Sequence, residues 1–237
     1  MKVIILCGGL GSRLAEETKL IPKPMVKIGR LPILQHIIKI YKSYGFNEFI
    51  LATGYKNKII DNYFKNKKNI KCIYTGKNTL TGGRILRLKK FFKKDENFMM
   101  TYGDGLTNQN LIKLLKFHLK NKKIATMTVV KPTARFGEVF LNGNKVKKFE
   151  EKPQLNNNWI NGGFFVLNYK IFKYIEGDQV MLERQPLIKM TKIKELIAFK
   201  HFGFWHCMDT MRDKNLLKKL WHSKKAPWIA PVKAKKS

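Results

Sequence analysis

A glycine-rich loop directly after the first apolar segment is the first place where residue types and spacing suggest chemistry. The loop reads Gly8-Gly9-Leu10-Gly11-Ser12-Arg13. Glycines let backbone N–H groups approach an anion closely, and an arginine adds a planar, permanently charged fork that suits phosphate. The loop lacks the third glycine of the dinucleotide fingerprint and the Gly-Lys-Ser/Thr ending of a P-loop. We therefore expect an anion-binding loop of another kind, with a purely structural strand–helix turn as the alternative.

A lysine between two prolines follows, in the segment Pro22-Lys23-Pro24-Met25. The prolines stiffen the backbone, so the scaffold largely sets the direction of the lysine. A lysine held in this way suits contact with a phosphate. The alternative is an ordinary solvent-facing lysine, because 48 of the 237 residues are Lys or Arg.

Two aspartates stand where a divalent cation is expected. Asp104 lies in Tyr102-Gly103-Asp104-Gly105, just after an apolar segment, and ligands of open α/β sheets bind beyond the carboxyl ends of the strands. Carboxylates in such places hold Mg²⁺, although an Asp-Gly turn is the alternative. Asp209 precedes Thr210, which with Asp213 matches a helix-capping signature. Asp209 lies just outside that cap and is available as a second metal ligand.

Weaker signals come from three further stretches. Thr81-Gly82-Gly83-Arg84 opens a helix with an arginine in its first turn, which is favourable for an anion. Glu150-Glu151-Lys152-Pro153, with the later Asn161-Gly162-Gly163, offers groups that hydrogen-bond a sugar and pair with a phosphate. The five histidines show no triad-like or ligand-like arrangement, and His118 falls on the core face of a helix.

The elements that must position these residues alternate between strand and helix in the first half of the chain. Apolar runs predict strands over 2–7, 48–53, 70–75 and 97–102, and periodic apolar residues predict helices over 33–44, 57–66, 83–92 and 109–120. This alternation favours an α/β fold with a mostly parallel sheet covered on both faces.

The second half begins with closely spaced strands, expected over 124–131, 137–141 and 145–150, with Asn142-Gly143-Asn144 as a hairpin turn. A strand over 163–168, helices over 169–176 and 185–194, a strand over 196–201 and a helix over 211–222 follow. No linker separates the halves, so we expect a single domain over 1–237, with halves of about 1–123 and 124–228 and a basic tail over 229–237.

Composition bounds the possible classes. The 48 Lys+Arg against 16 Asp+Glu give a net charge of +32, far beyond the magnitude of roughly 2 to 8 usual for a small domain. No apolar run approaches the roughly 18 residues of a membrane span, and the first apolar run is too short for a secretory signal. Cys7, Cys72 and Cys207 have no metal-binding or disulfide spacing. We expect a cytoplasmic protein.

Taken in order, these motifs resemble those of the sugar-1-phosphate nucleotidyltransferases over nearly the whole chain. Within that family the chain is most similar to the branch that uses CTP and glucose 1-phosphate. The features of that branch are Thr81-Gly82-Gly83-Arg84, Phe136-Gly137, Gly203-Phe204-Trp205 ahead of Asp209, and Lys225-Ala226-Pro227-Trp228. The resemblance implies a Rossmann-like nucleotidyltransferase fold: a mixed, mostly parallel sheet flanked by helices, with a small β-rich sugar-binding portion.

The resemblance also implies roles for individual residues. Catalytic roles fall to Arg13, Lys23, Asp104 and Asp209, of which the two aspartates would hold Mg²⁺. The nucleotide would be bound by Leu6, Cys7, Gly8, Gly9, Leu10, Gly11, Ser12, Arg13, Lys23, Thr79, Arg84 and Gly103. The sugar phosphate would be bound by Glu151, Lys152, Asn161 and Gly163. A homo-oligomer is expected on the same ground.

The implied reaction is attack of the glucose 1-phosphate oxygen on the α-phosphorus of CTP, giving CDP-glucose and pyrophosphate without a covalent enzyme intermediate. The connection between Phe64 and Thr79 is shorter than in that branch, and Cys7 stands where alanine is usual. The shorter connection keeps open the same chemistry with UTP or dTTP.

Two rival functions remain from other classes. The charge of +32 suggests a nucleic-acid-binding protein, but the basic residues are spread along the chain and are not interleaved with aromatics as stacking platforms require. We therefore expect no specific nucleic-acid partner. A protein that binds nucleotide without turning it over is the other rival, against which Asp104 and Asp209 argue.

Overall fold

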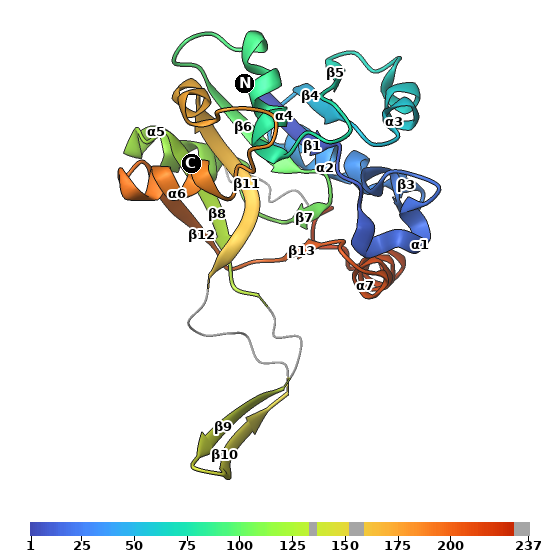
Figure 1. Ribbon diagram of the computed structural model, residues 1–237. Coiled ribbons are helices and arrows are strands. Elements are labelled where there is room, and N and C mark those ends of the chain that lie inside the picture. The colour runs from blue at the N-terminus through green and yellow to red at the C-terminus, as the bar shows by residue number, and fades with distance from the viewer. Residues whose placement is uncertain (133–136, 152–158, 230–237) are drawn as a thin grey trace, which may run out of the picture.

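The centre of the molecule is a seven-stranded mixed sheet. The computed structural model describes residues 1–132, 137–151 and 159–229. The strand order is β12-β8-β11-β6-β1-β4-β5 (Figure 1). These strands are β1 (Lys2–Cys7), β4 (Glu48–Thr53), β5 (Ile70–Tyr74), β6 (Asn97–Tyr102), β8 (Ala125–Val130), β11 (Ile160–Asn168) and β12 (Leu196–His201). Only β11 runs antiparallel to its neighbours, so the expected mixed, mostly parallel sheet is confirmed.

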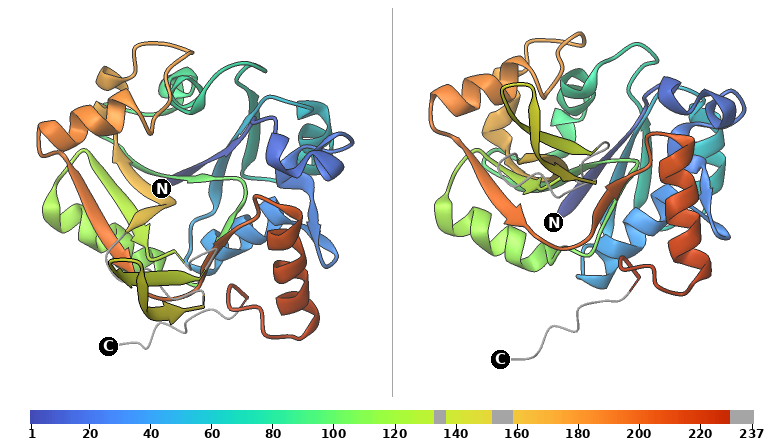
Figure 2. Two further views of the ribbon diagram at one scale, coloured as in Figure 1. Left: turned by 60° about the horizontal axis from the view of Figure 1, so that its bottom comes forward. Right: turned by 90° about the horizontal axis from the view of Figure 1, so that it is seen from below.

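Helices cover both faces because the side chains of the inner strands alternate between two apolar clusters. In β1, Val3 and Ile5 face one cluster whereas Ile4 and Leu6 face the other. The first cluster takes apolar side chains from α2 (Ile33–Ser43), α3 (Asn57–Phe64), α5 (Leu111–Asn121) and α7 (Met211–His222). The second takes them from α4 (Thr81–Arg87) and α6 (Gln185–Lys192). Figure 2 shows α5 and α6 on either side of β12.

A small two-stranded sheet at the carboxyl edge carries the segments with the two aspartates. It pairs β7 (Gly105–Thr107) with β13 (Trp205–Cys207) in antiparallel fashion. The Met208 N–H donates to the Asp104 carbonyl at 2.9 Å, which ties together chain segments about a hundred residues apart in sequence. Near the start of the chain, the short helix α1 (Ala15–Thr18) and the paired strands β2 (Lys27–Ile28) and β3 (Leu31–Pro32) complete this edge.

The three strands predicted over 124–131, 137–141 and 145–150 are all present, but they belong to two different sheets. The first, β8, joins the central sheet, whereas β9 (Glu138–Asn142) and β10 (Lys145–Glu150) pair only with each other (Figure 1). The predicted turn between them is confirmed, with Gly143 at φ 56°. One face of the hairpin exposes Val139, Leu141, Val146 and Phe149.

Two predicted boundaries are wrong, and one predicted helix is of another type. The helix expected over 83–92 begins at Thr81 and ends at Arg87, followed by a 3₁₀ turn at Lys89–Phe91. Gly82 and Gly83 lie inside its first turn because they pack on the backbone of residues 178–182, where a Cβ would come within 2.7 Å. The strand expected from Gly163 begins at Ile160 and continues through an irregular register. The helix expected over 169–176 is a 3₁₀ helix, Tyr169–Tyr174.

The other predicted helices and strands agree with the structure within about two residues at each end. His118 is buried on α5 as expected, although Leu119 on the same predicted stripe is exposed. The tail over 230–237 lies outside the described residues. Among the described residues, no helix is long and apolar enough to cross a membrane.

Candidate active site

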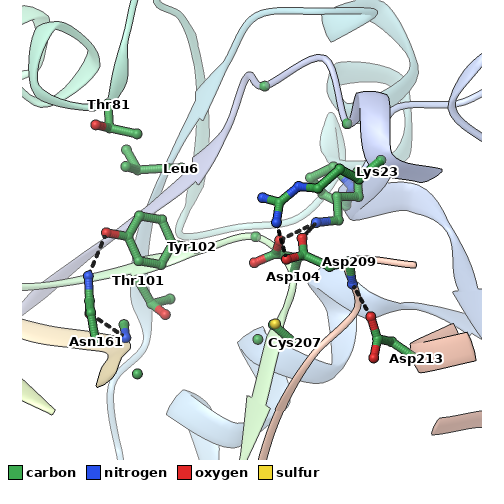
Figure 3. Close-up of a pocket in the computed structure, with 18 of the residues that line it drawn as sticks. Leu6, Lys23, Thr81, Thr101, Tyr102, Asp104, Asn161, Cys207, Asp209 and Asp213 are labelled. Carbon is green, nitrogen blue, oxygen red and sulfur yellow. Dashed lines mark hydrogen bonds and ion pairs between the residues drawn. The ribbon is translucent and has the colours of Figure 1, made fainter. Parts of the chain in front are cut away.

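A cleft of about 1340 Å³ opens at the carboxyl ends of the central strands, where the fold class predicts a ligand. Most of the residues singled out in the sequence line it (Figure 3). From the expected nucleotide set these are Leu6, Cys7, Gly8, Gly9, Gly11, Ser12, Arg13, Lys23, Thr79, Arg84 and Gly103. From the remaining sets, Asp104, Asp209, Asn161 and Gly163 also line it.

Two of the expected residues do not line the cleft, and a third lies outside the described residues. Leu10 is 53% exposed and does not line the cleft, because its loop turns it toward solvent. Glu151 is described, is exposed and does not line it. Lys152 lies outside the described residues, as does Phe136.

The glycine-rich loop is held by a left-handed turn. Gly11 has φ 68°, and its carbonyl accepts hydrogen bonds from the Leu14 N–H and the Thr18 hydroxyl. A side chain at position 11 would be strained by the positive φ and would meet the Thr18 methyl at 2.8 Å. This turn starts a 3₁₀ helix at Ser12–Leu14, which brings Arg13 to the cleft.

Lys23 lies between the two aspartates. Its Nζ is 2.5 Å from a carboxylate oxygen of Asp104 and 2.5 Å from one of Asp209. Arg13 pairs with the other oxygen of Asp209 at 2.7 Å. Burial acts to lower the pKa of Lys23, but the charges and hydrogen bonds of the two aspartates outweigh it and raise that pKa. The result is a tight four-membered charge cluster at one end of the cleft (Figure 3).

The capping box expected before the last helix is confirmed and holds Asp209 in place. Thr210 and Asp213 exchange hydrogen bonds at the start of α7, and Asp213 also accepts from the Asp209 N–H at 3.1 Å. Burial acts to raise the pKa of Asp213, but the Thr210 hydrogen bonds and neighbouring His206 leave it lowered. The carboxylate of Asp209 takes no part in the capping box. It points into the cleft, where it forms ion pairs with Lys23 and Arg13.

The donor set at this cluster fits a magnesium ion. Two carboxylates from separate segments already converge on one cation, the Lys23 ammonium. Within the described ranges, no group of three His, Cys, Asp or Glu side chains could hold a metal. Mg²⁺ is commonly bound by one or two carboxylates with substrate phosphates and water as its other ligands, so two aspartates meet its needs.

Arg84 is buried beside the glycine-rich loop and donates a hydrogen bond to it. Its side chain is 3% exposed, and its two terminal nitrogens donate to the carbonyls of Gly8, Thr53, Gly76 and Lys77 and to the Thr75 hydroxyl, over 2.7–3.3 Å. Burial lowers the pKa of Arg84. The guanidinium thus fastens the chain segments that follow β1, β4 and β5 to one another, and it acts on the loop through the Gly8 carbonyl.

We expect Arg84→Met to lower the free energy of unfolding by about 3 kcal/mol or more, because several buried oxygens lose their donors. Denaturant unfolding monitored by circular dichroism measures this. Arg87→Met is the matched control on the same helix, since Arg87 is exposed and makes only a surface ion pair with Asp178. Equal losses in both variants would contradict the assigned role of Arg84.

Asn161 and Gly163 line another part of the cleft, together with Tyr102 and Glu183, to which the sequence analysis assigned no role. Gly163 has φ 73°, and its N–H donates to Asn161 Oδ1 at 2.9 Å. Asn161 Nδ2 donates to the Tyr102 hydroxyl at 3.3 Å, and Tyr102 donates to Glu183 at 2.5 Å. Tyr102 stands inside a recognised motif, but Glu183 lies in no motif and only its tertiary contacts reveal it.

Comparison with known protein families shows to which family the chain belongs. The model of the family described as nucleotidyl transferase matches residues 2–201. The chain belongs to the nucleotidyl transferase family. The glucose-1-phosphate cytidylyltransferase of Salmonella typhimurium is 42% identical, over 96% of this chain and 98% of that protein. The probable glucose-1-phosphate cytidylyltransferase of Bacillus subtilis is 40% identical, over 96% and 99%.

Solved structures agree on the fold of this nucleotidyl transferase. HddC from Yersinia pseudotuberculosis, solved in complex with GMP-PN, superposes with a TM-score of 0.74 at 25% identity, covering 93% of this chain and 99% of that one. The alignment to the Salmonella relative extends over 253 positions, more than the 237 residues of this chain. That relative therefore has residues that this nucleotidyl transferase lacks.

Proposed function

We propose that this nucleotidyl transferase moves the cytidylyl group of CTP onto glucose 1-phosphate and releases CDP-glucose and pyrophosphate. The observation that carries the proposal is the likeness, at 40–42% identity over almost the full length, to two relatives named for this activity. The cleft adds support, because it joins a glycine-rich loop, two cations and two carboxylates in the way that a transfer between phosphates requires.

The proposed binding roles follow the positions of the residues in the cleft. The backbone of the Gly8–Ser12 loop, with Thr79 and Gly103, binds the nucleotide, and Arg84 holds that loop. Asn161 and Gly163, which line the cleft, receive the sugar phosphate. The same role for Glu151, which does not line the cleft, and for Lys152, outside the described residues, follows from the family resemblance alone. In this proposal the two phosphates meet near the charge cluster of Arg13, Lys23, Asp104 and Asp209.

Asp104 and Asp209 are the proposed holders of Mg²⁺. When bound, the ion neutralises phosphate charge and polarises a phosphoryl oxygen. Lys23 and Arg13 pair with the oxygens of the triphosphate and stabilise the charge that grows on the departing pyrophosphate. In the structure these two cations are paired with the aspartates, so they change partners when the triphosphate binds.

The proposed reaction is a direct in-line displacement. An oxygen of glucose 1-phosphate attacks the α-phosphorus of CTP, the bond from that phosphorus to the bridging oxygen breaks, and pyrophosphate leaves. The attacking phosphate is already anionic near neutral pH, so the reaction requires no general base. The protein contributes alignment of the two phosphates and electrostatic stabilisation, which are the main sources of rate in phosphoryl transfer.

The same chemistry with another pyrimidine nucleotide, UTP or dTTP, is the second candidate. The observation that favours it is the alignment of 253 positions to a chain of 237 residues, because residues absent from this chain are absent from its base contacts as well. The expected place of the shortening is the connection from Phe64 to Thr79, which includes β5 and leads directly into the cleft wall at Thr79.

The test of the proposal is pyrophosphate release with glucose 1-phosphate, Mg²⁺ and CTP, UTP, dTTP, GTP or ATP offered separately. We expect kcat/KM for CTP to exceed that for every other nucleotide by about a hundredfold. A clear preference for UTP or dTTP would support the second candidate function and contradict the use of CTP. No release with any nucleotide from folded protein would contradict the proposed reaction.

A further inference from the structure

The carboxylate of Glu183 accepts hydrogen bonds from two other elements that line the cleft. Its Oε1 accepts a hydrogen bond from the Tyr102 hydroxyl at 2.5 Å, and its Oε2 accepts one from the Thr81 hydroxyl at 2.6 Å. Tyr102 is the last residue of β6, Thr81 is the first residue of α4, and Glu183 lies two residues before α6. One half-buried side chain therefore connects three elements that border the cleft.

On the Tyr102 side, the hydrogen bonds form a directed chain. Burial and then the charge of Glu183 raise the pKa of Tyr102, so the hydroxyl stays protonated. It therefore donates a hydrogen bond to Glu183. The phenolic oxygen can then accept from Asn161 Nδ2, while Asn161 Oδ1 accepts from the Gly163 N–H. This chain fixes the orientation of the Asn161 amide, and it leaves one N–H of Nδ2 available for a ligand.

On the Thr81 side, the hydroxyl has both of its roles filled. It donates to Glu183 and accepts from the Leu182 N–H at 2.9 Å. These bonds fasten the first turn of α4, the helix that carries Arg84, to the segment before α6. Both oxygens of Glu183 are thus occupied by donors of the protein itself.

We propose that Glu183 is a positioning residue for the sugar 1-phosphate: it sets the orientation of Tyr102 and Asn161 and does not touch the reacting atoms. The inference rests on the proposed function, because Asn161 is the group expected to meet the sugar phosphate. Without the acceptor at position 183, the Tyr102 hydroxyl is free to rotate. Of the two hydrogen bonds that orient the Asn161 amide, the one from the Gly163 N–H remains, whereas the one to the Tyr102 oxygen is no longer held in direction.

The expected result is a selective loss of affinity for one substrate. Glu183→Ala raises the KM for glucose 1-phosphate about tenfold and changes the KM for CTP and kcat by less than about twofold. Glu183→Gln restores most of this loss, because its amide oxygen accepts from Tyr102 and its NH₂ donates to Thr81. Calorimetric titration with glucose 1-phosphate provides a readout of binding that does not require turnover.

Further variants separate positioning from a general loss of structure. Tyr102→Phe removes the donor and should match Glu183→Ala, and the double variant should be no worse than either single one because both break the same chain. Glu176→Ala is the control for an exposed carboxylate in the same part of the chain. If Glu183→Ala fails to fold, Tyr102→Phe and Glu183→Gln carry the test.

Several outcomes would overturn the inference. If Glu183→Gln binds glucose 1-phosphate as poorly as Glu183→Ala does, the charge itself contacts the ligand and the residue does more than position others. Unchanged KM values in Glu183→Ala, or additive losses in the double variant, would remove the role altogether. If the wild type is active and the variants give any of these results, only the role of Glu183 is contradicted. If the folded wild type makes no CDP-glucose, the proposed function on which the inference rests is contradicted as well.

Discussion

Asp104→Asn and Asp209→Asn are each expected to lower kcat by about a thousandfold or more while the protein stays folded. Both carboxylates converge on one cation in the cleft, and an asparagine keeps the shape of each side chain but removes the charge that holds Mg²⁺. Pyrophosphate release at saturating substrates measures the effect, and circular dichroism with thermal unfolding checks the fold.

Asp95→Asn is the matched control for these two variants. Asp95 is exposed, lines no part of the cleft and has φ 60°, a conformation that asparagine adopts readily. Its turnover should equal that of the wild type. Near-normal rates in Asp104→Asn or Asp209→Asn would remove that residue from the metal site, and raising the Mg²⁺ concentration should restore only a small part of the loss.

Lys23→Met is expected to separate metal affinity from turnover. In the structure the Lys23 ammonium lies between the carboxylates that are proposed to hold Mg²⁺, so it competes with the ion for them. Removing this positive charge should tighten the binding of Mg²⁺ alone by about tenfold, because the two aspartates then repel each other with only Arg13 to neutralise them. The same change should lower kcat by about a hundredfold, because a cation facing the departing pyrophosphate is lost.

Calorimetric titration of Mg²⁺ in the absence of substrates tests the first half of this prediction, and pyrophosphate release tests the second. Lys27→Met is the control, since Lys27 is exposed on β2 and does not line the cleft. Weaker Mg²⁺ binding in Lys23→Met would show that the lysine supports the metal site instead of competing for it. Turnover equal to that of the wild type would remove Lys23 from the catalytic set.

The alternation of strands and helices was predictable because the buried strands are short apolar runs that end at glycines. β1 and the loop after it show this most clearly: five buried side chains are followed by Gly8-Gly9, and the structure places that loop at the cleft. The capping box of Thr210 and Asp213 is a local pattern too, and it is present as predicted. Local signals of this kind depend only on neighbours in the sequence.

The predictions that are wrong depend on contacts between distant segments. The sequence predicts a helix over 83–92, but the helix starts at Thr81, with both glycines packed on the backbone near Asp178, and it ends at Arg87. The strand predicted over 124–131 is present as β8, but its pairing with β11 and β12 in the central sheet also depends on distant segments, so the spacing of the strands does not predict it.

The residues of the candidate site differ in the same way: some are recognised from local motifs, and others only from contacts between distant segments. Lys23, Asp104 and Asp209 are recognised from short motifs, and the structure places the Lys23 ammonium 2.5 Å from a carboxylate oxygen of each aspartate. Glu183 has no motif, and its partners Tyr102 and Thr81 lie 81 and 102 residues away in sequence, so only the folded chain connects them. The ion pairing of Lys23 with both aspartates was not predicted either, because the sequence indicated a phosphate contact alone.

The most direct test of the central claim is to identify the products by phosphorus NMR. Wild-type protein is incubated with equal amounts of CTP and glucose 1-phosphate in the presence of Mg²⁺, and the phosphorus signals are followed with time. The account predicts that CDP-glucose and pyrophosphate appear in equal amounts and that both stay absent when either substrate or Mg²⁺ is left out. Folded protein that consumes neither substrate, or that yields pyrophosphate without CDP-glucose, would contradict it.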